Sequence, residues 1–112
     1  MTHDDLVAKY PKILSGSGYP GVGEGWLPLI DQLCSWLQFN TDMNEHPQVK
    51  AVQIKEKFGG LRFYVENATE KQYAVISFVE NMSQHICDVC GSPGKIQGKG
   101  WISTRCEEHK DK

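Results

Sequence analysis

Residues 51–66 read AVQIKEKFGGLRFYVE, and this stretch decides the fold because it predicts two strands joined by a tight turn. Apolar and polar residues alternate on both sides of the turn, which is the period of a half-buried strand. The apolar positions are Val52, Ile54, Phe58, Leu61, Phe63 and Val65. Gly59-Gly60 supplies the positive φ angles that a tight turn needs. We therefore expect an antiparallel hairpin that buries these apolar side chains.

The opposite face of the hairpin is polar and locally basic. It carries Gln53, Lys55, Lys57, Arg62, Tyr64 and Glu66. Cations beside an aromatic ring can hold phosphates and stack a nucleic-acid base, or can meet an acidic patch of a protein. A solvated sheet face with cross-strand charge pairs is the alternative. We select Lys55, Lys57, Arg62 and Tyr64 as candidate partner-binding residues.

Glu56 is the exception to the alternation, since its parity places it on the buried face. Either the strand ends or bulges there, or a buried carboxylate meets a cation. We expect a frayed turn.

A helix is predicted before the hairpin, over residues 26–39. Apolar residues recur three and four apart, as on one stripe of a helix, and Pro28 fits its first turn. The stripe consists of Trp26, Leu29, Ile30, Leu33, Trp36 and Leu37. We assign it to the core, and we expect the neighbouring Cys34 to be a buried, inert thiol.

The N-terminal part predicts a short helix and a loop. Thr2, followed by Asp4 and Asp5, can cap a helix that runs to about Leu14, although Pro11 weakens its second half. Residues 15–25, SGSGYPGVGEG, are too rich in glycine for a helix or a long strand. This segment lacks the GxxxxGK[ST] pattern of a phosphate-binding loop, so we expect a connector.

A further helix is predicted after the hairpin, over residues 69–86, with Thr69 as its cap. Its apolar residues are also three or four apart: Tyr73, Ile76, Val79, Met82 and Ile86. The order helix, helix, hairpin, helix predicts an α+β fold in which helices pack against one face of a small sheet.

The C-terminal segment contains a metal-binding pattern. Cys87 and Cys90 are two residues apart, and after fifteen more residues Cys106 and His109 repeat that gap. Three thiolates and one imidazole in this spacing are typical of a tetrahedral zinc site. Disulfides are the alternative for the cysteines, and His85 is an alternative to His109 at poorer spacing. We expect one zinc ion.

The residues between the two ligand pairs predict a small hairpin, with strands at 95–97 and 101–104. A knuckle, a hairpin and a second ligand pair are the layout of a treble-clef finger. Four protein ligands leave zinc no open position, so we expect a structural ion. The prediction is a core over residues 1–86 and a zinc finger over 87–112, in one compact unit. Trp101 is a second candidate for partner binding.

Composition indicates a single folded domain. The chain has 112 residues, 39% of them apolar and 23% charged, and a formal net charge of −2. Such a charge gives no overall attraction for nucleic acid or an anionic membrane. No leader peptide and no apolar stretch long enough for a bilayer are visible, so we expect a cytoplasmic protein without a membrane role.

The hairpin string QIKEKFGGLRFY, the earlier GW, and the closing CDVCGSPG, GW and CEEH elements together resemble small uncharacterised proteins of phages and prophages. The resemblance covers residues 25–109, and its marks are a KEKFGxLRFY hairpin and a C-terminal CxxC...CxxH zinc module. It implies a viral or mobile-element origin and a place in the host cytoplasm. It brings no settled activity, but small phage proteins often act by occupying a host protein, including defence factors.

The sequence offers no nucleophile with a base, no close carboxylate pair and no incomplete metal shell. We therefore expect a non-enzymatic zinc-binding protein that docks on another protein. The alternatives are a nucleic-acid-binding module that uses the basic hairpin face, and a small enzyme with its site at the glycine-rich loop. The sequence leaves the oligomeric state open.

Overall fold

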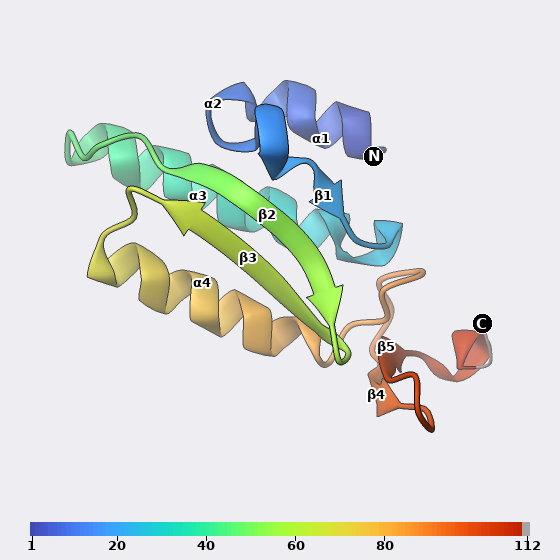
Figure 1. Cartoon of the computed structure of the whole chain (residues 1–112). Helices are drawn as coiled ribbons and strands as arrows, with labels where there is room; N and C mark the ends of the chain where they lie inside the picture. Colours follow the sequence, from blue (N-terminus) through green and yellow to red (C-terminus); the bar gives the residue numbers. More distant parts are fainter. Residues whose placement is uncertain (111–112) are drawn as a thin grey trace.

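The computed structural model describes residues 1–110, so the last two residues of the predicted finger segment lie outside it. Along the chain the elements are α1 (His3–Lys9), α2 (Pro11–Leu14), η1 (Gly16–Gly18), β1 (Pro20–Gly21), η2 (Glu24–Trp26), α3 (Leu27–Met43), β2 (Lys50–Lys57), β3 (Gly60–Glu66), α4 (Glu70–Ser83), β4 (Lys95–Gln97), β5 (Ser103–Arg105) and η3 (Glu107–His109). The strands form a three-stranded sheet, β1-β2-β3, and a two-stranded sheet, β4-β5. The predicted α+β class is confirmed (Figure 1).

The hairpin forms, and its turn lies one residue earlier than predicted. β2 and β3 are antiparallel, and Lys57 pairs with Gly60. The two turn residues are therefore Phe58 and Gly59, with φ angles of 52° and 83°. Positive φ at both positions is the mark of a type I′ turn, whose twist suits a hairpin. Because Phe58 occupies the turn, its side chain is exposed, and the prediction that it is buried in the core is wrong.

A bulge corrects a second prediction about the same strand. The register of β2 against β3 shifts between Ala51 and Gln53. An extra residue in one strand reverses the alternation of faces beyond it. As a result Ala51 is buried and Val52, predicted to be buried, is exposed, whereas Ile54 points into the core as expected.

Glu56 lies in β2, opposite Leu61, so the strand does not fray there. Its Oε2 accepts a hydrogen bond of 2.7 Å from the backbone N–H of Gly59. The carboxylate thus stabilises the turn through an amide, and neither of the two sequence-based explanations was correct.

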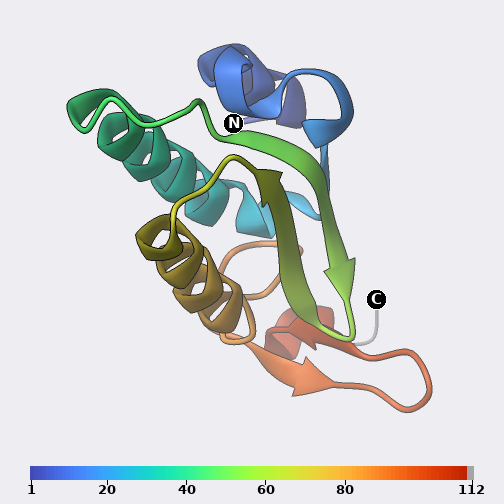
Figure 2. The ribbon, with the colours of Figure 1, turned by 60° about the vertical axis from the view of Figure 1, so that its left-hand side comes forward.

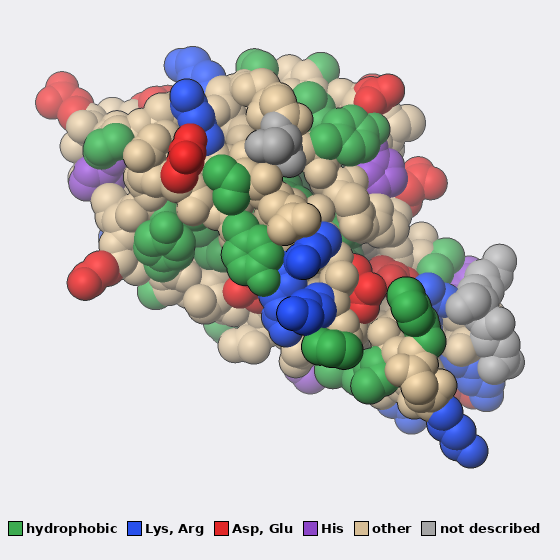
Figure 3. Space-filling view, viewed as in Figure 1, with side chains coloured by type: hydrophobic (Ala, Val, Ile, Leu, Met, Phe, Trp, Pro, Cys, Tyr) green, Lys and Arg blue, Asp and Glu red, His purple; other side chains and the backbone are tan. Residues whose placement is uncertain are grey.

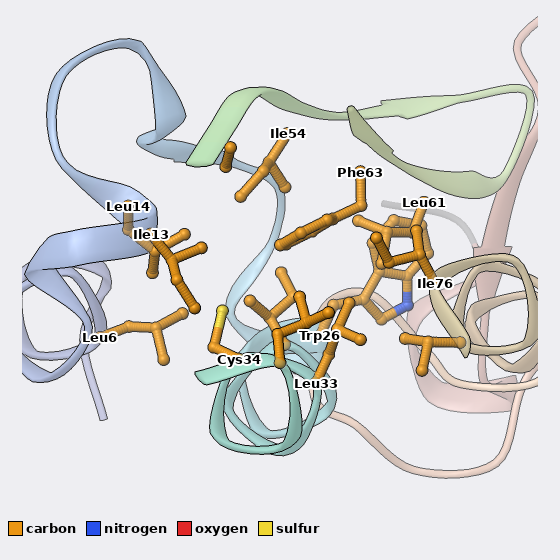
Figure 4. Packing of buried hydrophobic residues seen from close by; sticks show 14 of the residues in the cluster. Leu6, Ile13, Leu14, Trp26, Leu33, Cys34, Ile54, Leu61, Phe63 and Ile76 are labelled. Atoms are coloured by element: carbon orange, nitrogen blue, oxygen red, sulfur yellow. The ribbon is translucent and has the colours of Figure 1, made fainter. Parts of the chain in front are cut away.

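The core lies between the hairpin and the helices. Figure 2 shows α3 and α4 on one side of the hairpin, and Figure 4 shows the buried side chains that meet in this layer. The predicted stripe is buried at Trp26, which ends η2, and at Ile30, Leu33 and Leu37 of α3, and it is half-buried at Leu29 and Trp36. Cys34 is buried as expected, and burial raises the pKa of its thiol. The assignment of this stripe to the core is therefore largely confirmed.

Side chains of α4 cover the outer edge of β3. The Ser83 hydroxyl accepts from Leu61 N–H at 2.9 Å, and Glu80 Oε2 accepts from Phe63 N–H at 2.8 Å. A strand edge with free N–H groups invites pairing with another chain. Because α4 occupies these donors, the sheet presents its face to solvent rather than this edge. On α4 itself Ile76 and Val79 are buried, whereas Tyr73 and Met82 are largely exposed.

The glycine-rich segment is more than a connector. Its β1 pairs in parallel with β2, Pro20 against Ile54 and Gly21 against Lys55. Before it, the N-terminal helix breaks at Tyr10, where Pro11 begins α2, as the proline indicated. The segment then runs through η2 into α3 and passes the C-terminal module.

Candidate metal centre

Four side chains from two loops meet beyond the turn of the β2–β3 hairpin. Cys87, Cys90, Cys106 and His109 each offer one ligand atom, and these atoms all lie within 4.8 Å of one another. They belong to the C-terminal segment, residues 87–110, which we call the metal module. Both ribbon views place it at the turn end of the hairpin (Figures 1 and 2). The structure thus brings together the four residues that the sequence selected. His85 is exposed and belongs to no such group among the described residues.

The distances between the ligand atoms fit a tetrahedral ion. Bonds of about 2.3 Å to sulfur and about 2.0 Å to nitrogen place tetrahedral ligands about 3.8 Å apart between sulfurs and about 3.5 Å apart between sulfur and nitrogen. The Sγ atoms of Cys90 and Cys106 are 3.7 Å apart. His109 Nδ1 lies 3.2 Å from Cys106 Sγ and 3.8 Å from Cys87 Sγ. The group therefore has the size of a metal site.

The knuckle between the first two cysteines is built for an anionic sulfur. The N–H of Gly91 donates to the carbonyl of Cys87 at 2.9 Å, and Gly91 has a φ of 83°, which a glycine adopts without strain. Burial raises the pKa of Cys87, but the backbone N–H groups of Cys106, Cys90 and Val89 and the Cys106 thiol lower that pKa to about 6, whereas burial and the neighbouring sulfurs raise the pKa of Cys106. A thiolate is the form that binds metal.

The other ligand pair comes from the end of the small hairpin. β4 and β5 are antiparallel, and Cys106 directly follows β5. The single turn of η3 then carries His109, whose N–H donates to the carbonyl of Cys106 at 3.2 Å. This turn points both side chains at the knuckle, so the hairpin positions the second pair against the first.

The glycine-rich loop binds the knuckle by its backbone. The N–H of Gly25 donates to the carbonyl of Asp88 at 3.0 Å. A Cβ atom at Gly25 would lie 2.2 Å from the carbonyl oxygen of Cys87, and one at Gly23 would lie 2.1 Å from that of Asp88. Only glycine permits these approaches. The loop therefore has a structural role at the metal module that the sequence analysis did not assign.

Two side chains complete this junction. The indole Nε1 of Trp26 donates to the carbonyl of Ile86 at 2.7 Å, just before the first ligand. The hydroxyl of Thr104, fully buried on β5, donates to the carbonyl of Gly59 in the hairpin turn. Buried polar groups need such partners. The metal module is thus fixed to the core at Trp26 of η2, at the glycine-rich loop and at the hairpin turn.

An ion pair lies inside the module. Arg105 Nε is 2.6 Å from Asp88 Oδ1, and both side chains are largely buried. The pair joins the knuckle to β5, next to Cys106. Sequence reasoning missed it, although an aspartate between two ligand cysteines and an arginine before the third were visible signals.

The candidate partner-binding residues of the hairpin share one solvent-facing surface. Lys57 and Tyr64 are exposed, and Lys55 and Arg62 are half-buried. Lys55 Nζ lies 6.0 Å from the centre of the Tyr64 ring. Figure 3 shows Lys and Arg side chains gathered over the hairpin, with Asp and Glu side chains beside them toward the metal module. Among residues 1–110, none of these three cations forms an ion pair.

Trp101, the fifth candidate, is 80% exposed at the tip of the β4–β5 hairpin. It lines a pocket of about 210 Å³ together with Phe58 of the other hairpin turn. The sequence analysis missed Phe58 because alternation assigned it to the core.

A wider cleft of about 640 Å³ is lined by residues of the glycine-rich loop and of the metal module. Its polar lining includes His3, Glu24 and Glu56 besides the Asp88–Arg105 pair. His3 Nε2 lies 2.6 Å from the carbonyl oxygen of Val22, so its ring is engaged with the loop. The cleft is where the enzyme alternative would place its site.

None of the helices within residues 1–110 has the length and apolar character needed to cross a membrane. The chain was also compared with protein-family models, with curated proteins and with solved structures, and no match was found in any of the three comparisons.

Proposed function

We propose that Cys87, Cys90, Cys106 and His109 hold one zinc ion and that its role is structural. Three sulfurs and one nitrogen at tetrahedral spacing support zinc, which accepts this mixture of ligands. Four protein ligands complete a tetrahedron and leave no position for a reactive water. The knuckle, the β4–β5 hairpin and the turn η3 further support a small treble-clef-like finger.

The metal proposal is tested by elemental analysis of freshly purified protein. We expect one zinc per chain. Replacement of zinc by Co²⁺ should give the visible absorption of a tetrahedral site with thiolate ligands. Mass spectrometry that finds the cysteines joined in disulfides, with no bound metal, would overturn the proposal.

For the whole protein, the function supported best is non-enzymatic docking on another protein through the outer face of the hairpin. One observation carries it: Lys55, Lys57 and Arg62 share the outer face of the hairpin with the exposed Tyr64, Lys55 lies against the Tyr64 ring, and none of the three cations has an ion pair among the described residues. Arginine and tyrosine are enriched in the central residues of protein interfaces. A folded protein gains no stability from like charges placed together, so a binding role accounts for their position.

Nucleic-acid binding is the second candidate, and the contact between Lys55 and the Tyr64 ring favours it, because cations beside a stacking ring suit single strands. The surrounding charge favours protein. Glu56 and Glu24 line the cleft next to the basic face, and carboxylates there would repel a phosphate backbone that continued past the hairpin.

The resemblance to phage and prophage proteins suggests which protein is bound. We propose a host protein, defence factors included, met in the host cytoplasm. The size of the chain suits an inhibitor that occupies a surface, with no reaction of its own.

Affinity purification from host lysate tests the docking proposal with two double variants. Lys55→Glu with Lys57→Glu reverses the charge of the proposed surface, whereas Lys12→Glu with Lys71→Glu makes the same change at exposed positions on α2 and α4. We expect one partner in stoichiometric amount with the wild type and the control, and none with the first variant.

Titration of the same proteins with labelled oligonucleotides at low salt separates the two candidates. Binding that is lost in the Lys55/Lys57 variant and declines steeply with salt would replace the protein proposal by the nucleic-acid one. Equal capture of the partner by both double variants would remove the hairpin face from the function.

A further inference from the structure

Phe58 is an aromatic residue with an unfavourable backbone conformation and an exposed side chain. Phe58 has a φ of 52° and is 67% exposed. A bulky side chain with positive φ is uncommon, and Asn, Asp or Gly usually fills this position of a type I′ turn. Strained residues concentrate at functional sites, where the strain serves a purpose other than folding. Nothing in the packing of the hairpin accounts for an aromatic ring here.

A second exposed aromatic side chain lies beside it. Trp101 is 80% exposed and comes from the metal module, 43 positions further along the chain. The two residues line one pocket of about 210 Å³, which we call the notch. Glu56, Lys57, Gly100 and Ile102 complete its wall. The notch therefore depends on the contact between the two regions, where the Thr104 hydroxyl of the metal module donates to the carbonyl of Gly59 in the hairpin turn.

The size of the notch limits what it can hold. Pockets for cofactors and drug-sized ligands measure about 300 to 1,000 Å³, whereas the notch measures about 210 Å³. This volume suits one large side chain. Trp and Phe side chains at an interface commonly form the pockets into which a partner's anchor residue inserts.

The charges around the notch indicate which residues should lie next to the inserted side chain in the partner. Lys57 Nζ lies 5.7 Å from the centre of the Phe58 ring, and Lys55 and Arg62 follow on the same strand pair. These cations have no ion pair among the described residues. Complementary charge on a partner would be acidic.

We infer that the notch receives one large apolar side chain from an acidic segment of a partner protein, whose carboxylates then contact Lys55, Lys57 and Arg62. This inference rests on the proposed docking function and specifies its recognition element. Because Glu56 lies in the notch wall, only the apolar side chain enters the notch, and the acidic residues of the segment lie outside it, over the cations.

A library of short random peptides, displayed on phage and selected against the full metal-loaded chain, tests the inference. We expect the selected sequences to share one Trp, Phe or Leu next to Asp or Glu. Binding of the best peptide to Phe58→Asn and to Trp101→Ala should weaken at least about 30-fold, the usual effect of removing a central anchor contact. Ile96→Ala, which removes another exposed apolar side chain of the metal module, should bind as the wild type.

Both notch variants should remain folded, so lost binding cannot be attributed to unfolding. Asn suits the turn better than Phe does, and Trp101 contributes little to packing at 80% exposure. Thermal unfolding of each variant, with its metal content, checks this.

Three results would overturn the inference. The notch variants could bind the selected peptide as tightly as the wild type, the selection could enrich no acidic sequence with an apolar residue, or the notch could prove to be a contact between two copies of the chain in sedimentation experiments. After any of these results, the wild type could still capture a partner from host lysate that the Lys55→Glu, Lys57→Glu variant does not capture. The docking proposal would then stand, and only the role of the notch would be wrong. If no partner binds at all, the docking proposal fails as well.

Discussion

The helix–sheet core and the metal module are held together by different forces. The core buries a continuous cluster of apolar side chains from its four α-helices and from the β2–β3 hairpin. In the metal module the buried side chains are two ligand cysteines, Asp88 and Thr104, whereas its largest apolar residue, Trp101, is exposed. Apolar burial therefore stabilises one region, whereas hydrogen bonds and the proposed zinc ion stabilise the other. The two regions should respond differently to the same change.

The largest expected effect comes from one substitution made in each region. Cys87→Ser should abolish metal binding and unfold the metal module while the core remains folded, because metal-binding energy is the folding energy of such a module. Cys34→Ser should leave one metal ion per chain but destabilise the core by about 1 to 3 kcal/mol, since a hydroxyl replaces a buried thiol among apolar neighbours. Metal analysis and backbone amide NMR spectra measure both results.

The claim that the core folds without the metal module would be wrong if the spectrum of the Cys87→Ser protein lost the amide signals of α3 and β3 along with those of the module. Removal of the metal from the wild type by a chelator gives an independent reading. Signals of the core should persist, and those of the module should collapse.

Gly25→Ala should disrupt the buried contact between the glycine-rich loop and the metal module. An alanine Cβ there would lie 2.2 Å from the carbonyl oxygen of Cys87, and backbone cannot move aside as a flexible side chain can. We expect a loss of about 2 to 4 kcal/mol, as for strongly overpacked sites. Urea unfolding followed by tryptophan fluorescence measures it.

Gly16→Ala is the matched control in the same glycine-rich segment. A Cβ at Gly16 meets nothing within 4 Å, although its φ of 71° disfavours alanine. Gly16→Ala should lower the free energy of unfolding by about 1 kcal/mol, the penalty for a side chain in the left-handed region. Equal losses at the two glycines would mean that the segment does not clamp the module.

The contrast also explains what the sequence could predict. The clustering of the four Cys and His side chains was predicted correctly because the spacing within each pair is a local property of the chain. The stripe of α3 was found for the same reason, since helical periodicity places its residues on one face. Both depend on residues that are close in sequence.

The errors concern features set by distant partners. The bulge at Ala51 reverses strand parity, and nothing in the local alternation marks it. Phe58 looks like a core residue until the register with β3 places it in the turn. The role of Gly25 depends on Cys87, far along the chain, and on a backbone approach that leaves no pattern in side-chain type.

Thr104→Val tests the hydrogen-bonded character of the junction with little change in shape. The substitution leaves the carbonyl of Gly59 without its buried donor, which should cost about 1 to 2 kcal/mol. Hydrogen exchange should accelerate at the hairpin turn and in β5, while the metal content remains at one ion per chain. An unchanged exchange rate at both places would show that the metal module is held by its other contacts alone.

The smallest expected effect concerns a polar contact within the core region. The Tyr10 hydroxyl donates to Asp31 Oδ1 at 2.6 Å and joins the N-terminal helices to α3. This bond, with Lys9 and against the effect of burial, lowers the pKa of the Asp31 carboxyl. A carboxyl with a lowered pKa stabilises the fold above its ordinary pKa of about 4. The contribution is lost as pH falls through the lower value of the folded state.

Tyr10→Phe should therefore destabilise the protein by about 1 kcal/mol at neutral pH. The difference from the wild type should shrink in acid, once Asp31 is protonated in both proteins. Urea unfolding at a series of pH values measures this, with Asp31→Asn as the comparison that lacks the charge throughout. Because the contact is remote from the metal ligands, the amide signals of the metal module should not change in either variant. A change in those signals would show that the core and the metal module do not respond independently.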